Sequence, residues 1–300
     1  MKFFVVLFSF FMVLFADSKL DLDANVVGVK LDQNTLFIGL DSGELYDYDL
    51  KNKSLTKILE LPKISTTTQE NIGSRISGID VFKDKIAFIY ETDNKLKKVG
   101  VFDGKLTSFD VEEGIKGIFF LNENLILLVS LSSEVYYLDL NSKKLTLEAK
   151  LSYSSWISES VYLASSSYLV AVSEGGVVYY FDVKTKKVVK ELPIQKDILY
   201  SVGAVGDKFL AGSAENLAYY FDGEKPHIFK TNNKHVFRVG LSENFGAYYT
   251  EDGIDIFSTN NAELFKHIDY DKEQVSYLLF WDDTLISVSY DNTIYFWSIR

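Results

Sequence analysis

A five-residue ending recurs seven times along this chain and constrains its fold more than any other feature. The copies are Leu45–Asp49, Val99–Asp103, Val135–Asp139, Val178–Asp182, Ala218–Asp222, Ile254–Ser258 and Ile294–Ser298. Their last residues are separated by 54, 36, 43, 40, 36 and 40 positions. Aromatic and β-branched residues in short alternating runs favour strands. A repeat of about 40 residues on short strands indicates one supersecondary unit repeated around a ring.

Each repeat carries a second recurring element upstream of this ending, and five of the seven copies contain a glycine near the middle. These elements are Val26–Leu31, Ile76–Phe82, Ile115–Leu121, Ser158–Ala164, Leu199–Val205, Val236–Ser242 and Val275–Trp281. A glycine inside a strand indicates a close backbone approach, as expected for strands that crowd a central axis. With a second apolar strand after it and an outer strand after the ending, each repeat forms a four-stranded antiparallel blade. The sequence therefore predicts an all-β, seven-bladed β-propeller.

The last repeat is incomplete, because only Ile299 and Arg300 follow its ending at Ser298. An alternating polar and apolar stretch, Lys19–Asp23, lies near the other end of the chain. A strand here would supply the fourth strand of the last blade and cover the exposed edges on both sides of the seam. We therefore expect the ring to be closed by an N-terminal strand.

The first 16 residues have the pattern of a secretory signal peptide. Lys2 precedes an apolar run from Phe3 to Phe15, and the small residue Ala16 follows it. The run is shorter than the roughly 20 apolar residues that a membrane-spanning helix needs. We therefore expect a signal peptide at 1–16, a single propeller domain at 17–300 and a periplasmic location.

Composition argues against several kinds of function. The formal net charge of −11 disfavours binding to nucleic acid, whose phosphates would be repelled. The absence of cysteine excludes disulfides, thiol catalysis and cysteine-ligated metals. The three histidines fall on the outer strands of neighbouring blades (His227 and His267) or in the loop between those blades (His235), so a shared metal is not expected. We predict no catalytic residue, no metal, no cofactor and a monomer that is not an enzyme.

Two places that interrupt the repeat are candidate binding sites. The link Ser152–Trp156 carries Tyr153 and Trp156 among small polar residues, and exposed aromatics are typical anchors of protein interfaces. Trp156 could instead pack between the third and fourth blades. The insertion Pro62–Arg75 is either a flexible surface loop or a binding loop.

Charged residues supply two further candidates. Arg75 and Arg238 are expected to point toward one face of the ring or into its channel. Each turn after a second strand also carries an acidic residue, which could belong to a cation-attracting ring. The alternative, that these acids form ordinary turns, is favoured. They are Asp41, Glu44, Asp93, Glu134, Glu174, Glu215, Glu251, Asp252 and Asp291.

The repeat resembles that of WD40-type propellers over nearly the whole mature chain. The dipeptide that ends a WD40 repeat corresponds here to Phe102-Asp103, Leu138-Asp139, Phe181-Asp182, Phe221-Asp222 and Trp297-Ser298. The Gly-His pair that opens such repeats is absent, so the histidine network of that family is not implied. The overall plan is also similar to the NapL-type accessory proteins of the periplasmic nitrate reductase system. That resemblance implies a supporting role for a respiratory enzyme or its maturation factors, without chemistry of its own.

These observations favour an exported, non-catalytic platform for protein partners, with Tyr153, Trp156, Arg75 and Arg238 as candidate contact residues. Two alternatives stay open. One is a propeller enzyme with calcium or a quinone at the axis, for which the polar inner-strand residues Asp80, Glu159 and Arg238 would have to converge. The other is a scaffold for outer-membrane assembly.

Overall fold

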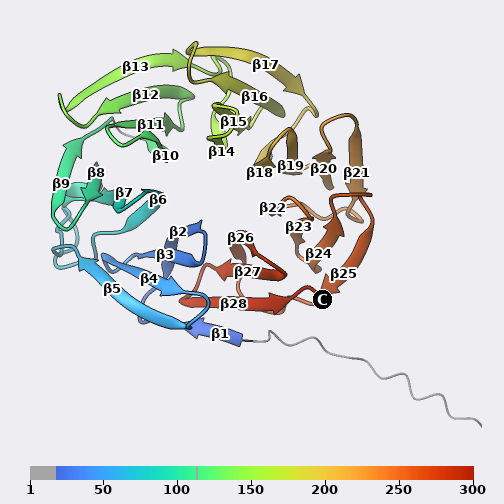
Figure 1. Ribbon diagram of the computed structural model, residues 1–300, viewed down its shortest axis with the longest axis horizontal. Coiled ribbons are helices and arrows are strands. Elements are labelled where there is room, and N and C mark those ends of the chain that lie inside the picture. The colour runs from blue at the N-terminus through green and yellow to red at the C-terminus, as the bar shows by residue number, and fades with distance from the viewer. Residues whose placement is uncertain (1–17, 113) are drawn as a thin grey trace, which may run out of the picture.

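The computed structural model describes residues 18–112 and 114–300 as a ring of seven four-stranded antiparallel sheets around a central axis (Figure 1). The sheets follow one another in chain order, and the first strand of each lies innermost. The seven-bladed all-β fold predicted from the repeat is therefore confirmed. The signal peptide expected at 1–16 lies outside the described residues.

Blades 1 to 3 are built from consecutive strands. Blade 1 contains β2 (Val26–Asp32), β3 (Thr35–Leu40), β4 (Glu44–Asp49) and β5 (Ser54–Glu60). Blade 2 contains β6 (Ile76–Phe82), β7 (Lys85–Glu91), β8 (Lys97–Phe102) and β9 (Leu106–Asp110), with a short 3-10 turn, η1 (Asp93–Lys95), before β8. Blade 3 contains β10 (Ile115–Asn122), β11 (Leu125–Ser130), β12 (Glu134–Asp139) and β13 (Lys144–Lys150).

Blades 4 to 6 repeat the same order. Blade 4 contains β14 (Ile157–Leu163), β15 (Tyr168–Ser173), β16 (Val177–Asp182) and β17 (Lys187–Pro193). Blade 5 contains β18 (Leu199–Val205), β19 (Lys208–Ser213), β20 (Leu217–Phe221) and β21 (Pro226–Lys230). Blade 6 contains β22 (Arg238–Leu241), β23 (Phe245–Thr250), β24 (Gly253–Ser258) and β25 (Leu264–Ile268), and its inner strand is shorter than the predicted Val236–Ser242.

Blade 7 joins the two ends of the chain, as the incomplete last repeat predicted. It contains β26 (Val275–Trp281), β27 (Thr284–Ser289) and β28 (Thr293–Ser298), and β1 (Ser18–Asp21) pairs antiparallel with β28. Beyond the strand, the Leu22 N–H donates to the Asn292 carbonyl at 2.9 Å, and the Leu22 side chain is buried. The N-terminal strand therefore closes the ring, and the seam prediction is confirmed.

The core consists of apolar layers between neighbouring blades. Alternate residues of a strand point to opposite faces of its sheet, and both faces of a blade are covered. In β11, Ile126 and Leu128 pack toward blade 2, whereas Leu127 and Val129 pack toward blade 4. This explains why second strands such as β11 read as continuous apolar runs.

The residue that ends the repeated motif shapes the turn that follows. In four blades this Asp accepts hydrogen bonds from the main-chain N–H groups two and three residues further on; the four are Asp49, Asp139, Asp182 and Asp222. These main-chain donors hold the pKa of each carboxyl below its usual value. In blade 6, Ser258 accepts from the Asn260 N–H at 3.3 Å. The recurring Asp thus marks a turn of the scaffold.

The inner-strand glycines lie where neighbouring blades approach one another most closely. A Cβ on Gly240 would lie 2.6 Å from the Leu278 carbonyl oxygen of blade 7, and one on Gly28 would lie 3.1 Å from the Ile76 carbonyl oxygen of blade 2. Both distances are too short for ordinary side-chain packing. The close approach predicted from the glycines is therefore confirmed.

Side chains of the inner strands tie each blade to the next. At every one of the seven junctions, an inner-strand side chain forms a hydrogen bond or ion pair with the following or preceding inner strand. In ring order the ties are Lys30 Nζ with Asp80 Oδ1 (2.6 Å), Phe120 N–H with Asp80 Oδ2 (2.7 Å), Lys116 Nζ with the Ser158 carbonyl, Val202 N–H with Glu159 Oε2 (2.9 Å), Val239 N–H with Ser201 Oγ (3.2 Å), Arg238 Nε with the Ser276 carbonyl (2.8 Å) and Tyr277 Oη with the Val27 carbonyl (3.3 Å).

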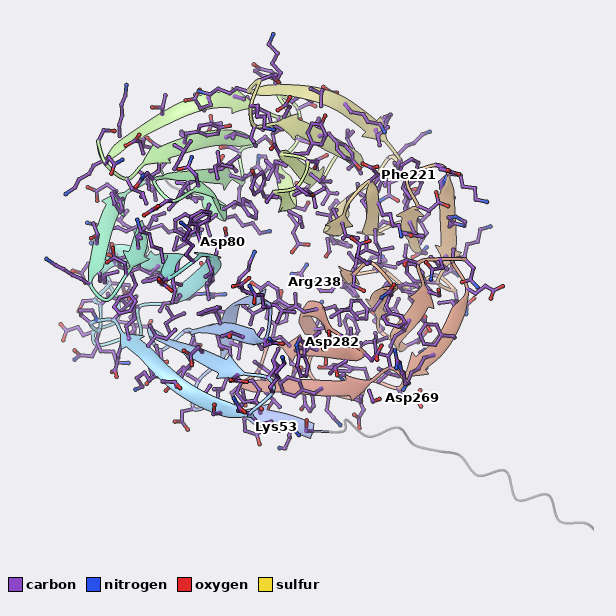
Figure 2. All side chains as sticks on the ribbon, in the orientation of Figure 1. Lys53, Asp80, Phe221, Arg238, Asp269 and Asp282 are labelled. Carbon is purple, nitrogen blue, oxygen red and sulfur yellow. The ribbon has the colours of Figure 1, made fainter. Side chains whose placement is uncertain are left out.

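These ties account for the polar inner-strand residues that an axial cofactor site would have used. Asp80, Glu159 and Arg238 each bond to a neighbouring blade, and Figure 2 shows Asp80 and Arg238 on the inner side of the ring at different blades. The positions of these three residues are explained by the bonds that they form between blades.

Candidate functional site

One face of the ring carries all the links between blades. In a four-stranded antiparallel blade, the turn after the second strand and the link after the fourth strand lie at the end where the first strand begins. We call this end the link face. Both places singled out in the sequence, Pro62–Arg75 and Ser152–Trp156, are links of this kind, between β5 and β6 and between β13 and β14.

The link Ser152–Trp156 presents its two aromatic side chains to solvent. Tyr153 is 90% exposed and Trp156 is 62% exposed. The Ser152 hydroxyl accepts hydrogen bonds from the Ser154 and Ser155 N–H groups at 3.3 and 3.1 Å, and the Ser133 hydroxyl donates to the Ser155 carbonyl at 2.6 Å. The alternative that Trp156 packs between blades 3 and 4 is therefore wrong. The loop holds both rings outward on an anchored backbone.

Further exposed apolar side chains lie on the same face. Leu96 and Leu131 belong to turns after second strands, and Tyr290 belongs to the corresponding turn of blade 7; their exposed fractions are 51, 39 and 50%. The other large exposed hydrophobic residues among those described lie on the outermost strands of their blades and are Leu55, Leu147, Val189, Ile228, Leu264 and Phe265. Exposed apolar surface is thus concentrated on the link face and the rim.

The insertion Pro62–Arg75 is anchored near both of its ends. Ile64 and Ile72 form an antiparallel bridge, and Ile64 is buried. The loop also docks onto the 3-10 turn of blade 2, because Asp93 Oδ1 accepts from the Ser65 N–H at 2.8 Å. These contacts anchor the two ends of the insertion, which delivers Arg75 to the start of β6.

Arg75 and Arg238 line one cavity in the mouth of the channel. The cavity measures about 570 Å³ and is lined by the starts of the inner strands and the ends of the second strands, so it opens at the link face. Arg238 is fixed in its wall by hydrogen bonds from Nε to the Ser276 carbonyl and from Nη2 to the Tyr290 hydroxyl, at 2.8 and 3.1 Å. Both arginines therefore lie at the channel, as predicted.

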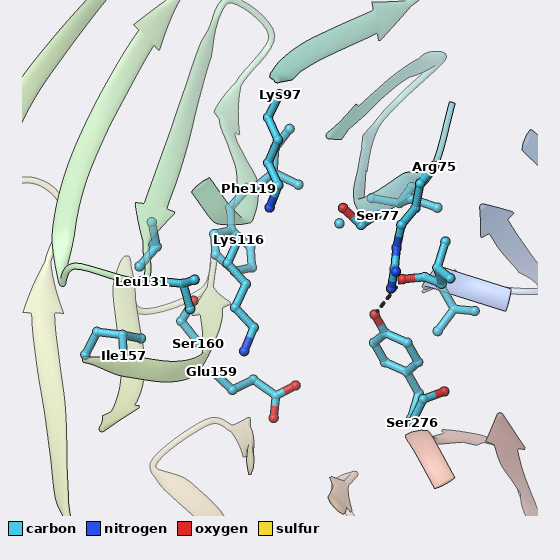
Figure 3. A pocket seen from close by; sticks show the side chains of 18 of the residues that line it. Arg75, Ser77, Lys97, Lys116, Phe119, Leu131, Ile157, Glu159, Ser160 and Ser276 are labelled. Atoms are coloured by element: carbon cyan, nitrogen blue, oxygen red, sulfur yellow. Dashed lines mark hydrogen bonds between the residues drawn. The ribbon is translucent and has the colours of Figure 1, made fainter. Parts of the chain in front are cut away.

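Two lysines that the sequence analysis did not single out complete the cationic lining. Lys97 begins β8 and donates from Nζ to the Ile115 carbonyl at 3.0 Å, and Lys116 is the second residue of β10. Figure 3 shows Arg75, Lys97, Lys116 and Glu159 around the same space. In the sequence, Lys116 could have been noticed as a lysine inside an otherwise apolar, glycine-bearing inner strand; Lys97 has no such signal.

The environment of these lysines disfavours their protonated forms. Burial in the cavity wall lowers the pKa of Lys97; the Glu91 carboxylate opposes this shift, and the Arg75 guanidinium adds to it. Burial also lowers the pKa of Lys116, although solvent reaches this side chain; Glu159 opposes the shift, and Arg238 and Lys97 add to it. Burial raises the pKa of the Tyr277 phenol to about 12. The channel mouth therefore brings several positive groups together where water screens them less than on the open surface.

The acidic residues of the link face serve mainly as turn formers and ion-pair partners. Asp41 accepts from the Asn25 N–H at 3.2 Å and Asp291 from the Thr293 N–H at 2.8 Å. Glu44 pairs with Lys57 at 2.5 Å, and Glu251 with Lys234 at 3.1 Å. The contacts of these four residues support the interpretation that they form turns and ion pairs of the scaffold, and not a cation-attracting ring.

The histidines stay apart, as predicted. His227 contacts Asp222 at 2.7 Å on blade 5, and His267 contacts Asp255 at 2.7 Å on blade 6. His235 lies in the link between those blades against the rings of Tyr200 and Phe237. Within residues 18–112 and 114–300, no group of three or more His, Asp or Glu side chains is arranged to hold a metal ion. No helix in this part of the chain is long and apolar enough to cross a membrane.

Comparison with known proteins identifies the fold. No known family profile and no curated protein sequence matches the chain. Among solved structures, the β-propeller domain of Cps50 (Swd1) from Myceliophteria thermophila has a TM-score of 0.76 at 14% identity, covering 95% of this chain and 99% of that one. A chain of the mitotic checkpoint complex has a TM-score of 0.75 at 11% identity, covering 95% and 92%.

A designed protein shows the same architecture. The computationally designed Ika8 protein has a TM-score of 0.68 at 13% identity, covering 93% of this chain and 98% of its own. The three similarities extend over nearly the whole described ring at low identity. They confirm the propeller fold, and they leave the residues of the link face as the basis for any functional conclusion.

Proposed function

We propose that this protein is a non-catalytic interaction platform that docks a protein partner on its link face. The observation that carries the proposal is the pair Tyr153 and Trp156, which are 90 and 62% exposed on a loop whose backbone is fixed by serine hydroxyls. Aromatic side chains held outward on a rigid loop lose little entropy on binding and are enriched at interface hot spots. Leu96, Leu131 and Tyr290 extend the apolar surface around the channel mouth.

The fold supports such a role. Propellers offer a rigid ring on which loops can vary, and one chain of similar fold comes from a structure of the mitotic checkpoint complex. At 11% identity this likeness does not transfer a partner to the present chain.

The partner that fits the N-terminal pattern is an exported protein. The run Phe3–Phe15 after Lys2 has the form of a signal peptide, and removal at Ala16 would leave Ser18–Asp21, the strand that closes the ring, in the mature protein. An acidic, cysteine-free propeller of this plan suits the periplasm, where it would support a respiratory enzyme such as the nitrate reductase or its maturation factors. N-terminal sequencing of the protein from its native host is expected to give Asp17 as the first residue.

Loss of both aromatic side chains should weaken partner binding strongly. We expect the double variant Tyr153→Ala/Trp156→Ala to lower the affinity for the partner by about thirtyfold to several hundredfold, because two hot-spot aromatics of about 1–2 kcal/mol each are removed. The measurement is affinity purification from the periplasmic fraction, followed by titration of the recovered partner.

The matched control is Val189→Ala/Ile228→Ala, which removes two similarly exposed side chains from the outermost strands of blades 4 and 5. This variant should bind the partner as the wild type does. Equal binding by the Tyr153→Ala/Trp156→Ala variant would refute docking at this loop. Recovery of a barrel-assembly protein instead of a respiratory one would replace the nitrate reductase assignment.

A further inference from the structure

The cavity in the channel mouth has an excess of positive charge that the rest of the protein does not share. Arg75, Lys97, Lys116 and Arg238 line it, against two carboxylates, Glu91 and Glu159. The whole chain contains 31 basic and 42 acidic residues. A local excess of two positive charges inside an acidic protein is therefore opposite in sign to what composition alone would place there.

None of these four cations is neutralised by a carboxylate within the described part of the chain, since none forms an ion pair within 4.0 Å there. Three of them donate hydrogen bonds to neutral oxygens. Lys97 and Lys116 donate to the Ile115 and Ser158 carbonyls, and Arg238 donates to the Ser276 carbonyl and the Tyr290 hydroxyl. These bonds hold the charges in place without cancelling them.

Of the two carboxylates, Glu159 is already engaged by the scaffold. Its Oε2 accepts the Val202 N–H at 2.9 Å, which ties blade 4 to blade 5. It attracts both Lys116 and Arg238 from beyond ion-pair distance. One carboxylate shared by two cations leaves the group with net positive charge.

The size and the donors of the cavity fit a small ligand. About 570 Å³ lies within the range of roughly 300–1,000 Å³ found for small-molecule pockets. A guanidinium can bind a carboxylate or phosphate through two parallel hydrogen bonds, and ammonium groups add point charges. Ser77 and Ser160 place two hydroxyl groups in the same lining.

We propose that the channel mouth binds a small dianion bearing carboxylate or phosphate oxygens, held between Arg75, Lys97 and Lys116, with Arg238 fixed behind it. Such a ligand would neutralise the two excess charges and relieve the repulsion among the cations. It enters from the link face, where the cavity opens. This site does not depend on Tyr153 and Trp156, so it can be tested apart from the docking of a protein.

The test is isothermal titration calorimetry of the purified protein with succinate and, separately, with inorganic phosphate. Sodium chloride keeps the ionic strength constant. We expect saturable binding of at least one of the two anions, and which one binds identifies the oxyanion. Lys116→Gln should weaken binding by about tenfold, the factor expected for loss of one charge-assisted hydrogen bond. The matched control Lys98→Gln, a lysine paired with Asp110 at 3.0 Å, should bind as the wild type does.

Glu159→Gln gives a test of opposite sign. Glutamine keeps an oxygen that can accept the Val202 N–H, while the negative charge is removed, so we expect this variant to bind the dianion more tightly by about threefold to tenfold. A weaker affinity of Glu159→Gln for the dianion would overturn the proposal, because the cavity would then favour cations. Absence of saturable binding of both anions to the wild type would also overturn it. The Tyr153→Ala/Trp156→Ala variant should retain anion binding, which separates this site from the docking loop.

Discussion

Replacing Asp80 by alanine should destabilise the ring far more than an ordinary surface substitution. Asp80 is buried and joins three blades, since Oδ1 pairs with Lys30 Nζ of blade 1 and Oδ2 accepts the Phe120 N–H of blade 3. Removing it leaves a buried N–H without an acceptor and a lysine without its partner, at a cost of about 2–3 kcal/mol. We expect the Tm to fall by about 5–10 °C in a thermal unfolding scan.

Two controls isolate the cause. Asp80→Asn keeps an oxygen for the Phe120 N–H and loses the ion pair, so it should lower the Tm by less than half as much. Asp110→Ala removes an exposed carboxylate that pairs with Lys98, and it should change the Tm by less than about 2 °C. If Asp80→Ala unfolds at the same temperature as Asp110→Ala, the inner-strand ties do not hold the blades together.

Removal of the N-terminal strand should open the ring. A chain that begins at Ala24 lacks β1, so the edge of β28 is left unpaired. It also lacks Leu20 and Leu22, whose side chains pack against blades 1 and 7. Losing two leucines of about 1.5–3 kcal/mol each, in addition to the strand pairing, should lower the Tm by about 10 °C or more. The exposed edge of β28 is an open template for pairing, so we also expect self-association in size-exclusion chromatography.

The control for this deletion begins at Ser18 and keeps the whole strand. It should unfold at the temperature of the chain that begins at Asp17 and elute as a monomer. An equal Tm and a monomeric profile for the chain that begins at Ala24 would show that blade 7 is stable with three strands, and the seam would have no role in closure.

The scaffold could be predicted from the sequence because its physical requirements are local and repeated. The Asp that ends four of the motifs bonds to main-chain groups two and three residues away, so the same residue recurs wherever that turn is needed. Gly28 and Gly240 recur because each lies against the backbone of the next blade. The seam could be predicted by counting strands, since a missing strand at one end and a spare one at the other can satisfy each other.

The channel mouth could be predicted only in part, because its residues meet through the curvature of the ring. Arg75 lies in a link, Lys97 at the start of a third strand and Lys116 in an inner strand, and no spacing in the sequence brings them together. Lysines are also common on surfaces, so Lys97 carries no local signal. The polar inner-strand residues were visible in the sequence, but their role in tying blades depends on the distance between neighbouring strands.

The central functional claim is that a protein partner docks on the link face and not on the rim. Site-specific photo-crosslinking in living cells tests it most directly, with the photoreactive amino acid p-benzoylphenylalanine placed at Trp156 in one strain and at Val189 in another. Val189 is 52% exposed on β17, the outermost strand of blade 4. A crosslinked adduct from position 156 and none from position 189 is the predicted result. An adduct from position 189 alone would contradict docking on the link face.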